Sequence, residues 1–375
     1  MTRALRVLHI ASGDLWAGAE VQAFTLMSHL TRMPETAVAA VLMNEGTLCD
    51  RLRSVGILVH VVDEQSASPI AILSRLRDVL RSWRPDIVHT HREKENILGS
   101  LASRLWGNVP CVRTVHGANE HLEGNGWSDI RRQVVSNLDR WCGRALQQRV
   151  IAVTRDLGAQ LAGEFSADKI AVIENGIDTE EVKQAIGVAE FRQAAPNATH
   201  IGIAGRLVHV KRVDLFLETA ALLLRDHPHR NWKFHVFGDG PMRRELEEFS
   251  KALQISKRVT FHGHRQDILT CIAGLHGLVM CSDHEGMPMV ALEATALGVP
   301  MVAHAVGGLI DVVPEEFLVA QHTAYGYKEG VLRILCSDGR TIFTKNAAET
   351  LMRFSAQRNA DRVRALYVQV LAEKG

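Results

Sequence analysis

The chain has 375 residues, of which 46% are apolar and 23% are charged, and its formal net charge is +1. This length exceeds what one hydrophobic core usually serves, so two domains are expected. The small net charge argues against a general nucleic-acid binder, and no apolar stretch approaches the roughly 18 residues of a membrane-spanning helix.

The N-terminus and the cysteines indicate a cytoplasmic location. Residues 1–10 run into a short alternating strand and lack the long apolar segment of an export signal. The six cysteines are scattered, without a C-x-x-C pair, and mostly have apolar neighbours, which is typical of buried free thiols. We therefore expect a cytoplasmic protein without disulfides and without a structural metal.

The first half of the chain alternates short β-branched runs with longer amphipathic segments, the pattern of parallel strands joined by crossover helices. The predicted strands lie at 5–11, 38–43, 58–62, 86–90, 110–116, 149–154 and 170–174. The predicted helices lie at 19–31, 69–82 and 96–106, and a long arginine-bearing segment follows at 127–148. This alternation predicts a doubly wound, Rossmann-like α/β domain over residues 1–190.

The second half repeats this alternation. A polar, alanine-rich segment at 178–199 contains Pro196 and predicts the linker. Strands are then predicted at 200–205, 233–238, 259–262, 277–281 and 299–303, with helices near 213–225, 242–253 and 289–297. We expect a second Rossmann-like domain over residues 196–355. The final helix, within 356–375, is expected to pack back toward the N-terminal domain.

Ligands in open α/β sheets bind beyond the carboxyl ends of the strands, so the loops at these ends hold the candidate site. After the first predicted strand, Gly18 lies in a loop that opens a helix and lets the backbone approach a phosphate, although a tight turn explains the same glycine. Neither G-x-G-x-x-G nor G-x-x-x-x-G-K-[ST] occurs, so the dinucleotide fingerprint and the nucleoside-triphosphate loop are absent.

The C-terminal half carries two cations at a strand-to-helix junction. Arg206 follows the strand at 200–205, and Lys211 precedes the next helix. Arginine can bond two phosphate oxygens at once, and lysine adds a point charge. This pair suits a diphosphate, whereas either cation alone is ordinary surface charge.

A second loop adds an anion site and two acids. Glu285, Gly286, Met287 and Pro288 lead into the helix at 289–297, whose N-terminus offers backbone N–H groups to a diphosphate. Glu285 and Glu293 are eight positions apart, at most roughly 12 Å if both were helical, which matches the reach from ribose to sugar across a diphosphate. Each carboxylate can accept bonds from vicinal hydroxyls. A capping acid and an ordinary helix glutamate are the alternative.

Three histidines stand at predicted strand ends. His116 ends the strand at 110–116, where its imidazole faces the expected cleft, and His89 and His91 alternate at the end of another strand. A metal site built from His89 and His91 lacks an obvious third ligand. The Gly307-Gly308 pair either brings the backbone close to a ligand or only turns the chain.

In combination, these motifs resemble the retaining glycosyltransferases of family four (group 1), which have the GT-B fold. The motifs that carry the resemblance are Ala17-Gly18-Ala19-Glu20, Thr114 to Gly117, Ile173 to Asp178, Gly205-Arg206-Leu207 with Lys211, Phe237 to Pro241, Phe261-His262-Gly263, Glu285 to Pro288 with Glu293-Ala294, Gly298-Val299-Pro300 and Gly307-Gly308. Ala17 replaces the first glycine of the family's N-terminal loop, and Ile310-Asp311 stands where the family often has Pro-Glu.

The resemblance implies two Rossmann-like domains facing a cleft and a retaining transfer of a hexose-type sugar from a nucleotide-diphosphate donor. Arg206 and Lys211 would bind the donor phosphates, Glu285 the hydroxyls of the transferred sugar and Glu293 the ribose. His116 would lie near the reacting sugar. A D-x-D motif is absent, so the sequence requires no metal or other cofactor. Family frequency favours a UDP-sugar, with a GDP-sugar as the alternative.

The acceptor implied by the resemblance is a hydroxyl of a saccharide or a lipid-linked intermediate in bacterial surface polysaccharide synthesis. Residues 75–155 contain 14 Lys or Arg against 8 Asp or Glu, with tryptophans interspersed, which suggests contact with anionic lipid at the inner face of a membrane or with a phosphorylated acceptor. A solvated face with core tryptophans explains the same composition. Two other functions stay open, a non-catalytic nucleotide-sugar-binding protein and a nicotinamide-dependent dehydrogenase.

Overall fold

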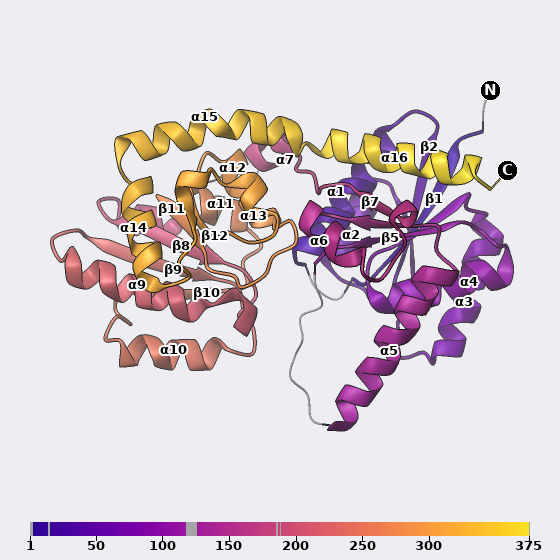
Figure 1. The fold of residues 1–375 in the computed structure, drawn as a ribbon, viewed down its shortest axis with the longest axis horizontal. Coiled ribbons are helices and arrows are strands. Elements are labelled where there is room, and N and C mark those ends of the chain that lie inside the picture. Colours follow the sequence, from indigo (N-terminus) through magenta and orange to yellow (C-terminus); the bar gives the residue numbers. More distant parts are fainter. Residues whose placement is uncertain (1–2, 14–15, 118–125, 185–186, 188, 375) are drawn as a thin grey trace. The chain divides into compact units, whose positions relative to one another are not determined.

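The computed structural model describes residues 3–13, 16–117, 126–184, 187 and 189–374, and it describes only the backbone at 126–132 and 337. The chain divides into two compact units. The N-terminal unit comprises Met1–Gly176 with Phe354–Gly375, and the C-terminal unit comprises Ile177–Arg353. Figure 1 colours both units by sequence.

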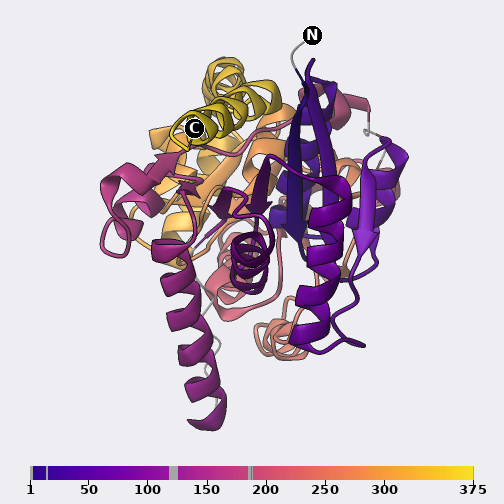
Figure 2. The same cartoon turned by 90° about the vertical axis from the view of Figure 1, so that its right-hand side faces the viewer.

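The N-terminal unit contains a parallel sheet with the strand order β3-β2-β1-β4-β5-β6-β7. Its strands are β1 Leu5–Ala11, β2 Thr36–Leu42, β3 Leu58–Val61, β4 Ile87–Thr90, β5 Cys111–Val115, β6 Arg149–Ala152 and β7 Ile170–Val172. Its helices are α1 Gly18–Arg32, α2 Thr47–Ser54, α3 Pro69–Trp83, α4 Glu93–Trp106, α5 Gly126–Ala145, α6 Arg155–Leu161 and α16 Ala356–Ala372. In Figures 1 and 2, α5 extends away from this sheet.

The C-terminal unit contains a second parallel sheet, in the order β10-β9-β8-β11-β12-β13. Its strands are β8 Thr199–Ala204, β9 Trp232–Phe237, β10 Val259–Gly263, β11 Gly277–Met280, β12 Met301–His304 and β13 Leu318–Val319. Its helices are α7 Thr179–Gln184, α8 Glu190–Ala194, α9 Val213–Asp226, α10 Arg243–Ala252, α11 Ile268–Ala273, α12 Met289–Ala296, α13 Leu309–Val312, α14 Ala324–Ile334 and α15 Ser337–Arg353. The predicted fold class, two doubly wound α/β sheets, is confirmed.

The side chains of β1 pack alternately into two different cores, as expected of a central strand of the sheet. Val7 and Ala11 belong to the core beneath α1, α2 and α16, whereas Leu8 and Ile10 belong to the core beneath α3 and α4. Successive side chains of a strand point to opposite faces, so a strand covered by helices on both faces is apolar at nearly every position. Of the seven residues of β1, only Arg6 and His9 have polar side chains.

Helix boundaries follow local chemistry that is readable in the sequence. Ser68 caps α3 by accepting a hydrogen bond from the N–H of Ala71 at 3.3 Å, and Pro69 occupies the first turn. Arg84 ends the helix in the left-handed conformation, at φ 49°. The sequence prediction for this helix, 69–82, therefore differs from the structure by a single residue.

The segment expected to be a linker is folded in the structure. Residues 179–184 and 190–194 are the helices α7 and α8, and α7 packs against α12 of the C-terminal unit. The N–H of Gly187 donates to Thr270 Oγ1 at 3.0 Å. These contacts place residues 177–195 with the C-terminal unit, whereas the sequence analysis assigned residues up to 190 to the N-terminal domain.

Other elements escaped the sequence analysis. Helices α2, α14 and α15 and the short strand β13 were not predicted, because they lack a clean apolar period or are very short. All six cysteines are free, but Cys336 is exposed, contrary to the expectation of buried thiols. Among the described helices, none combines the length and the apolar character that a bilayer crossing requires.

Candidate active site

Both sheets reverse their strand order beside the first strand of the unit. The reversal falls between β1 and β4 in the N-terminal unit and between β8 and β11 in the C-terminal unit. Loops that leave such a switch point in opposite directions open a crevice at the carboxyl edge of the sheet, which is where doubly wound proteins bind ligands. Gly18, Arg206, Lys211 and Glu285 follow these strands, whereas His116 follows β5 and Glu293 lies within α12.

Lys211 and Glu285 meet at the switch point of the C-terminal unit. Lys211 lies in the 3₁₀ turn His209–Lys211 after β8, and Glu285 lies in the loop after β11. Lys211 Nζ is 2.6 Å from Glu285 Oε1, and the hydroxyl of Ser282 donates to the same oxygen at 2.6 Å. The Lys211 side chain is 23% exposed and that of Glu285 only 7%. The ammonium group therefore stays within reach of a ligand while it neutralises a nearly buried carboxylate.

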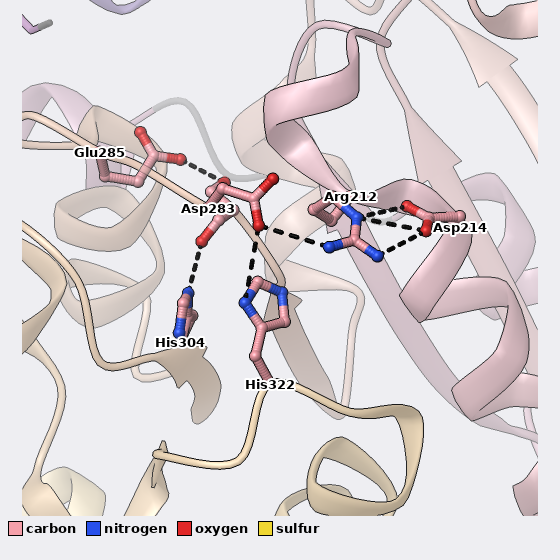
Figure 3. Close-up of polar contacts among 7 residues, drawn as sticks. Arg212, Asp214, Asp283, Glu285, His304 and His322 are labelled. Carbon is pink, nitrogen blue, oxygen red and sulfur yellow. Dashed lines mark hydrogen bonds and ion pairs between the residues drawn. The ribbon is translucent and has the colours of Figure 1, made fainter.

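A second cation, Arg212, directly follows Lys211 in the chain, and Figure 3 shows it between Asp214 and Asp283. Its guanidinium bonds the Asp214 carboxylate at 2.9 to 3.2 Å and contacts Asp283 at 3.4 Å. The Asp214 hydrogen bonds hold the pKa of Arg212 above its usual range. Sequence analysis missed Arg212, although it stands between Lys211 and an acid two positions later. Through its contacts with these two carboxylates, Arg212 orients the loop after β8 and the loop after β11.

Figure 3 also shows two histidines, His304 and His322, close to Asp283. The imidazole of His304 donates from Nδ1 to the carbonyl oxygen of Ser282 at 2.8 Å. His322 Nδ1 lies 3.7 Å from Asp283 Oδ1, and the two rings are 3.8 Å apart at their centres. Burial lowers the pKa of His322. These contacts fix the backbone that carries Glu285, and no sequence motif indicated them.

Glycine is required where the loops of the site cross. A Cβ on Gly307, whose φ is +51°, would lie 1.8 Å from the carbonyl oxygen of Glu285, and the N–H of Gly308 donates to the carbonyl of Gly286 at 2.8 Å. A Cβ on Gly238, at φ +121°, would lie 1.9 Å from the carbonyl oxygen of Gly205. The Gly307-Gly308 turn thus packs on the backbone of Glu285 and Gly286.

Helix α12 begins directly after this loop. Met289 is its first residue, as in the predicted helix 289–297, and Pro288 is the N-cap. Met287 is buried, whereas Gly286 and Pro288 are half-buried. Glu285 precedes the helix, so the eight-residue helical spacing to Glu293 does not describe the actual arrangement.

Glu293 lies on the covered face of α12 and is only 8% exposed. Burial, and to a smaller extent the neighbouring Glu181, raises the pKa of its carboxyl group to about 7. A carboxyl group with this pKa is part protonated at neutral pH, so a ligand that needs a carboxylate acceptor must displace a proton.

Arg206 is exposed at the end of β8, next to a small hollow of about 10 Å³ that is lined by Gly205, Lys211 and Ser282 together with apolar side chains. The structure thus brings Lys211, Ser282 and Glu285 into direct contact. Arg206 and Glu293 belong to the same unit, but no contact joins their side chains to that group among the interactions described.

In the N-terminal unit, Gly18 is the first residue of α1 and is exposed. The helix is capped by Glu20, whose carboxylate accepts from the N–H of Ala17 at 3.3 Å and forms an ion pair with Arg92. Arg92 follows β4, on the other side of the switch point. Residues 14 and 15 of the glycine-bearing loop lie outside the described residues.

His116 follows β5 and is half-buried. Its Nε2 lies 3.2 Å from His91 Nδ1, and burial lowers the pKa of His116 to about 4, with a smaller contribution from Arg92. His89 and His91, for which the sequence offered no third partner, are joined in the structure by His9 of β1, whose ring nitrogens lie within 4.8 Å of theirs. His9 was overlooked because it lies inside an apolar strand.

Comparisons with known proteins place both units in one family. The model "Glycosyltransferase Family 4" matches residues 16–181, and the model "Glycosyl transferases group 1" matches residues 198–337. A D-inositol 3-phosphate glycosyltransferase of Actinosynnema mirum is 30% identical over 311 residues, which cover 76% of this chain and 72% of the relative.

A second curated relative is the Escherichia coli UDP-Gal:alpha-D-GlcNAc-diphosphoundecaprenol alpha-1,3-galactosyltransferase, 27% identical over 317 residues, or 80% of each chain. Among solved structures, Anabaena HepE in complex with UDP and glucose superposes with a TM-score of 0.81 at 20% identity, covering 97% of this chain and 100% of HepE. The structural likeness supports the GT-B fold. The chain belongs to the group 1, family-four glycosyltransferases, has the GT-B fold and is a glycosyltransferase.

Proposed function

We propose that the protein transfers a hexose-type sugar, with retention of anomeric configuration, from a UDP-sugar to a hydroxyl of a lipid-linked saccharide during bacterial surface polysaccharide synthesis. The observation that carries the proposal is the Lys211–Ser282–Glu285 group at the switch point of the C-terminal unit. It combines a cation with a hydroxyl-binding carboxylate, as a sugar diphosphate requires. The UDP-bound structure of HepE and the UDP-Gal in the relative's name favour uracil as the donor base.

Each predicted site residue of the C-terminal unit has a role in this proposal. Arg206 and Lys211 bind the diphosphate and stabilise the charge that develops as it leaves, assisted by the backbone N–H groups at the start of α12. Glu285 accepts hydrogen bonds from the hydroxyls of the transferred sugar. Gly286, Met287 and Pro288 hold the backbone close to the donor, and on the N-terminal unit Gly18 allows a similarly close approach. Arg206 and Lys211 supply the positive charge that a bridging metal ion supplies in other transferases.

Glu293 binds the ribose hydroxyls of the donor in this proposal. Because its pKa is raised to about 7, binding of a vicinal diol to its carboxylate form releases a proton. Donor affinity is therefore expected to rise with pH through about 7 and to lose this dependence in Glu293→Gln.

The acceptor side involves His116, which we propose to donate a hydrogen bond to an oxygen of a substrate. A lipid-linked acceptor requires contact with a membrane surface, and α5 supports this. Val134, Leu138 and Trp141 lie on one face of that helix at spacings of four and three residues, and they are 60%, 39% and 52% exposed. The surrounding segment has the surplus of basic residues that anionic lipids attract.

The experiment that tests the proposal is release of nucleoside diphosphate from a panel of UDP- and GDP-hexoses, with and without an undecaprenyl-diphosphate-linked sugar acceptor. Acceptor-dependent release from one donor supports transfer, and nuclear magnetic resonance of the product then gives its anomeric configuration. An inverted anomer would exclude retention. Stable donor binding with no turnover on any acceptor would favour the non-catalytic binding protein.

A further inference from the structure

Three imidazoles form a hydrogen-bonded row that ends at His116. His9 Nδ1 lies 2.9 Å from His91 Nε2, and His91 Nδ1 lies 3.2 Å from His116 Nε2. The ring planes are inclined by only 17° and 23°, with centres 5.3 and 5.5 Å apart. Nearly parallel rings whose nitrogens point at one another have the geometry of two successive N–H···N hydrogen bonds.

The two ends of this row differ in their surroundings. His9 Nε2 and His116 Nδ1 are both buried, and neither has a hydrogen-bond partner among the described residues. The His9 ring is 0% exposed, whereas His116 is half-buried. A ligand can therefore reach the His116 end more readily than the His9 end.

The three rings are neutral around pH 7. Burial lowers the pKa of His9 to about 3, that of His116 to about 4 and that of His91 well below its usual value. The charged groups nearest the row are Arg92, which lowers the pKa of His91 and His116, and its partner Glu20. Protonation of the row is therefore not expected until the pH falls to about 4.

Neutrality restricts the row to two arrangements of protons. Each neutral imidazole carries one N–H, and the two hydrogen bonds within the row use two of the three. Either all three rings are protonated at Nδ1, with the third N–H at His116, or all are protonated at Nε2, with the third N–H at His9. The three tautomers are thus coupled and change only together.

The burial of the ends decides between these arrangements. A donor N–H left at His9 Nε2 would belong to a fully buried ring that no ligand reaches, whereas an N–H at His116 Nδ1 belongs to a half-buried ring and can be paired by an oxygen of a bound substrate. We propose, resting on the proposed function, that His9 and His91 are positioning residues that hold His116 as its Nδ1–H tautomer, so that His116 donates a hydrogen bond to a hydroxyl or ring oxygen of the sugar substrate.

Neighbouring groups support a row and not a metal site. Ring nitrogens of His9, His89 and His91 lie within 4.8 Å of one another, close enough for three imidazoles to bind one divalent cation. However, His89 Nε2 is already 2.7 Å from the Thr114 hydroxyl, and His89 Nδ1 is 2.5 Å from the Tyr367 hydroxyl. His89 would have to give up one of these bonds to bind a cation, whereas the row uses every contact as it stands.

The first test reads the tautomers directly, without donor or turnover. Nitrogen-15 nuclear magnetic resonance of the histidine-labelled protein at pH 7 is expected to give neutral rings for His9, His91 and His116, each protonated at Nδ1. Assignment comes from loss of one signal in each single histidine variant. Mixed tautomers within the row, or the Nε2–H form in all three, would overturn the proposal. So would one equivalent of zinc found by mass spectrometry in the purified protein and lost in His9→Asn.

The second test separates positioning from packing by kinetics, on whichever of UDP-glucose, UDP-galactose or UDP-N-acetylglucosamine gives the fastest acceptor-dependent release of UDP. In His9→Phe the row loses its first hydrogen bond, and kcat is expected to fall about tenfold while KM for the donor stays within about twofold. In His9→Asn an amide N–H remains near the position of Nδ1, so most of the rate is expected to return.

The control is a similar row in the C-terminal unit, where His235 Nε2 is 2.9 Å from His200 Nδ1 and His235 Nδ1 is 2.9 Å from His262 Nε2. His235→Phe disturbs an equally buried row without touching His116. If His9→Phe lowers kcat no more than His235→Phe at equal folded fraction, positioning is refuted. If the wild type turns over none of the donors, the proposed function fails, whereas the tautomer measurement still decides the present inference.

Discussion

The carboxyl edges of the two sheets occupy the same topological position but carry different chemistry. In the C-terminal unit, the switch point holds several ion pairs, Lys211 with Glu285 and Arg212 with Asp214 and Asp283. In the N-terminal unit, one ion pair, Glu20 with Arg92, lies at the switch point, and the loops after β4 and β5 add two neutral imidazoles, His91 and His116. Backbone topology thus decides where a ligand binds, and the charge of the side chains decides whether phosphate or hydroxyl groups are suited to each edge.

The two histidine rows sharpen this comparison. In the C-terminal unit, His200 Nε2 lies 2.9 Å from the Ala195 carbonyl, an acceptor that fixes the tautomers of the neutral row from one end. In the N-terminal unit, both terminal nitrogens are without a partner among the described residues. A row whose end is bonded to the backbone has one fixed arrangement of protons, whereas a row with unbonded ends can respond to a ligand.

The largest effect is expected when the charged edge loses its cation. Lys211→Ala removes positive charge from the leaving diphosphate and leaves the nearly buried Glu285 with Ser282 as its remaining described partner. The expected fall in kcat/KM is roughly 10²- to 10³-fold. Steady-state assays of UDP release check it. The control Arg244→Ala breaks an exposed ion pair with Glu248 in the same unit, and an equal loss in both variants would refute a specific role for Lys211.

A second prediction concerns the pH dependence of stability. The pKa of Glu293 is about 7 in the folded state against 4.5 for an exposed glutamate, so folding binds a proton between these values. Stability should therefore fall as pH rises from about 4.5 to about 7 and stay level above, by about 3 kcal/mol. Glu293→Gln should remove this dependence.

Denaturant unfolding of both proteins at several pH values measures the difference. Glu316→Gln, at a residue in a short turn of the same unit, is the matched control. Parallel pH profiles for the wild type and Glu293→Gln would show that the Glu293 carboxyl is not perturbed in the fold.

Replacing a histidine of the N-terminal unit is expected to give a smaller kinetic effect. His116→Ala removes one neutral hydrogen-bond donor, which should lower kcat about tenfold and leave nucleotide binding unchanged. Calorimetric titration with UDP alongside the rate assay separates the two. Weaker UDP binding in this variant, by as much as in Lys211→Ala, would erase the proposed division between a hydroxyl-binding and a phosphate-binding edge.

The smallest effect is expected at α5. Replacing Leu138 and Trp141 by serine removes exposed apolar surface, so binding to vesicles with anionic lipid should weaken several-fold, with turnover of a water-soluble acceptor unchanged. Co-sedimentation measures the binding. Unaltered co-sedimentation would count against α5 as the membrane contact. The side chains of Arg131 and Arg132, two of the basic residues of the segment 75–155, lie outside the described residues.

The sequence allowed most of the strands and several of the long helices to be predicted, because apolar period and capping residues are local signals. Ser68 and Pro69, for example, mark the start of α3 in the sequence itself. Local patterns also indicated which loops carry Lys211 and Glu285. They could not indicate the ion pair between these residues, which are 74 positions apart, because that contact depends on the neighbouring placement of β8 and β11.

His9 illustrates the limit most clearly. In the sequence it is one polar residue in an apolar strand, and its significance depends on its register opposite His89 of β4. Parallel pairing across a switch point joins segments 80 residues apart, so no short-range pattern reports it. The short strand β13 was missed for the same reason, because it depends on pairing with β12.

The most direct test of the central claim, that the charged edge of the C-terminal unit binds a nucleotide diphosphate, is thermal unfolding with UDP, GDP, ADP and their sugar conjugates. A ligand that binds only the folded state raises the unfolding midpoint. We predict that UDP and UDP-sugars raise the midpoint of the wild type and of Arg244→Ala but not that of Lys211→Ala. No shift with any nucleotide in the folded wild type, or an equal shift in Lys211→Ala, would contradict the claim.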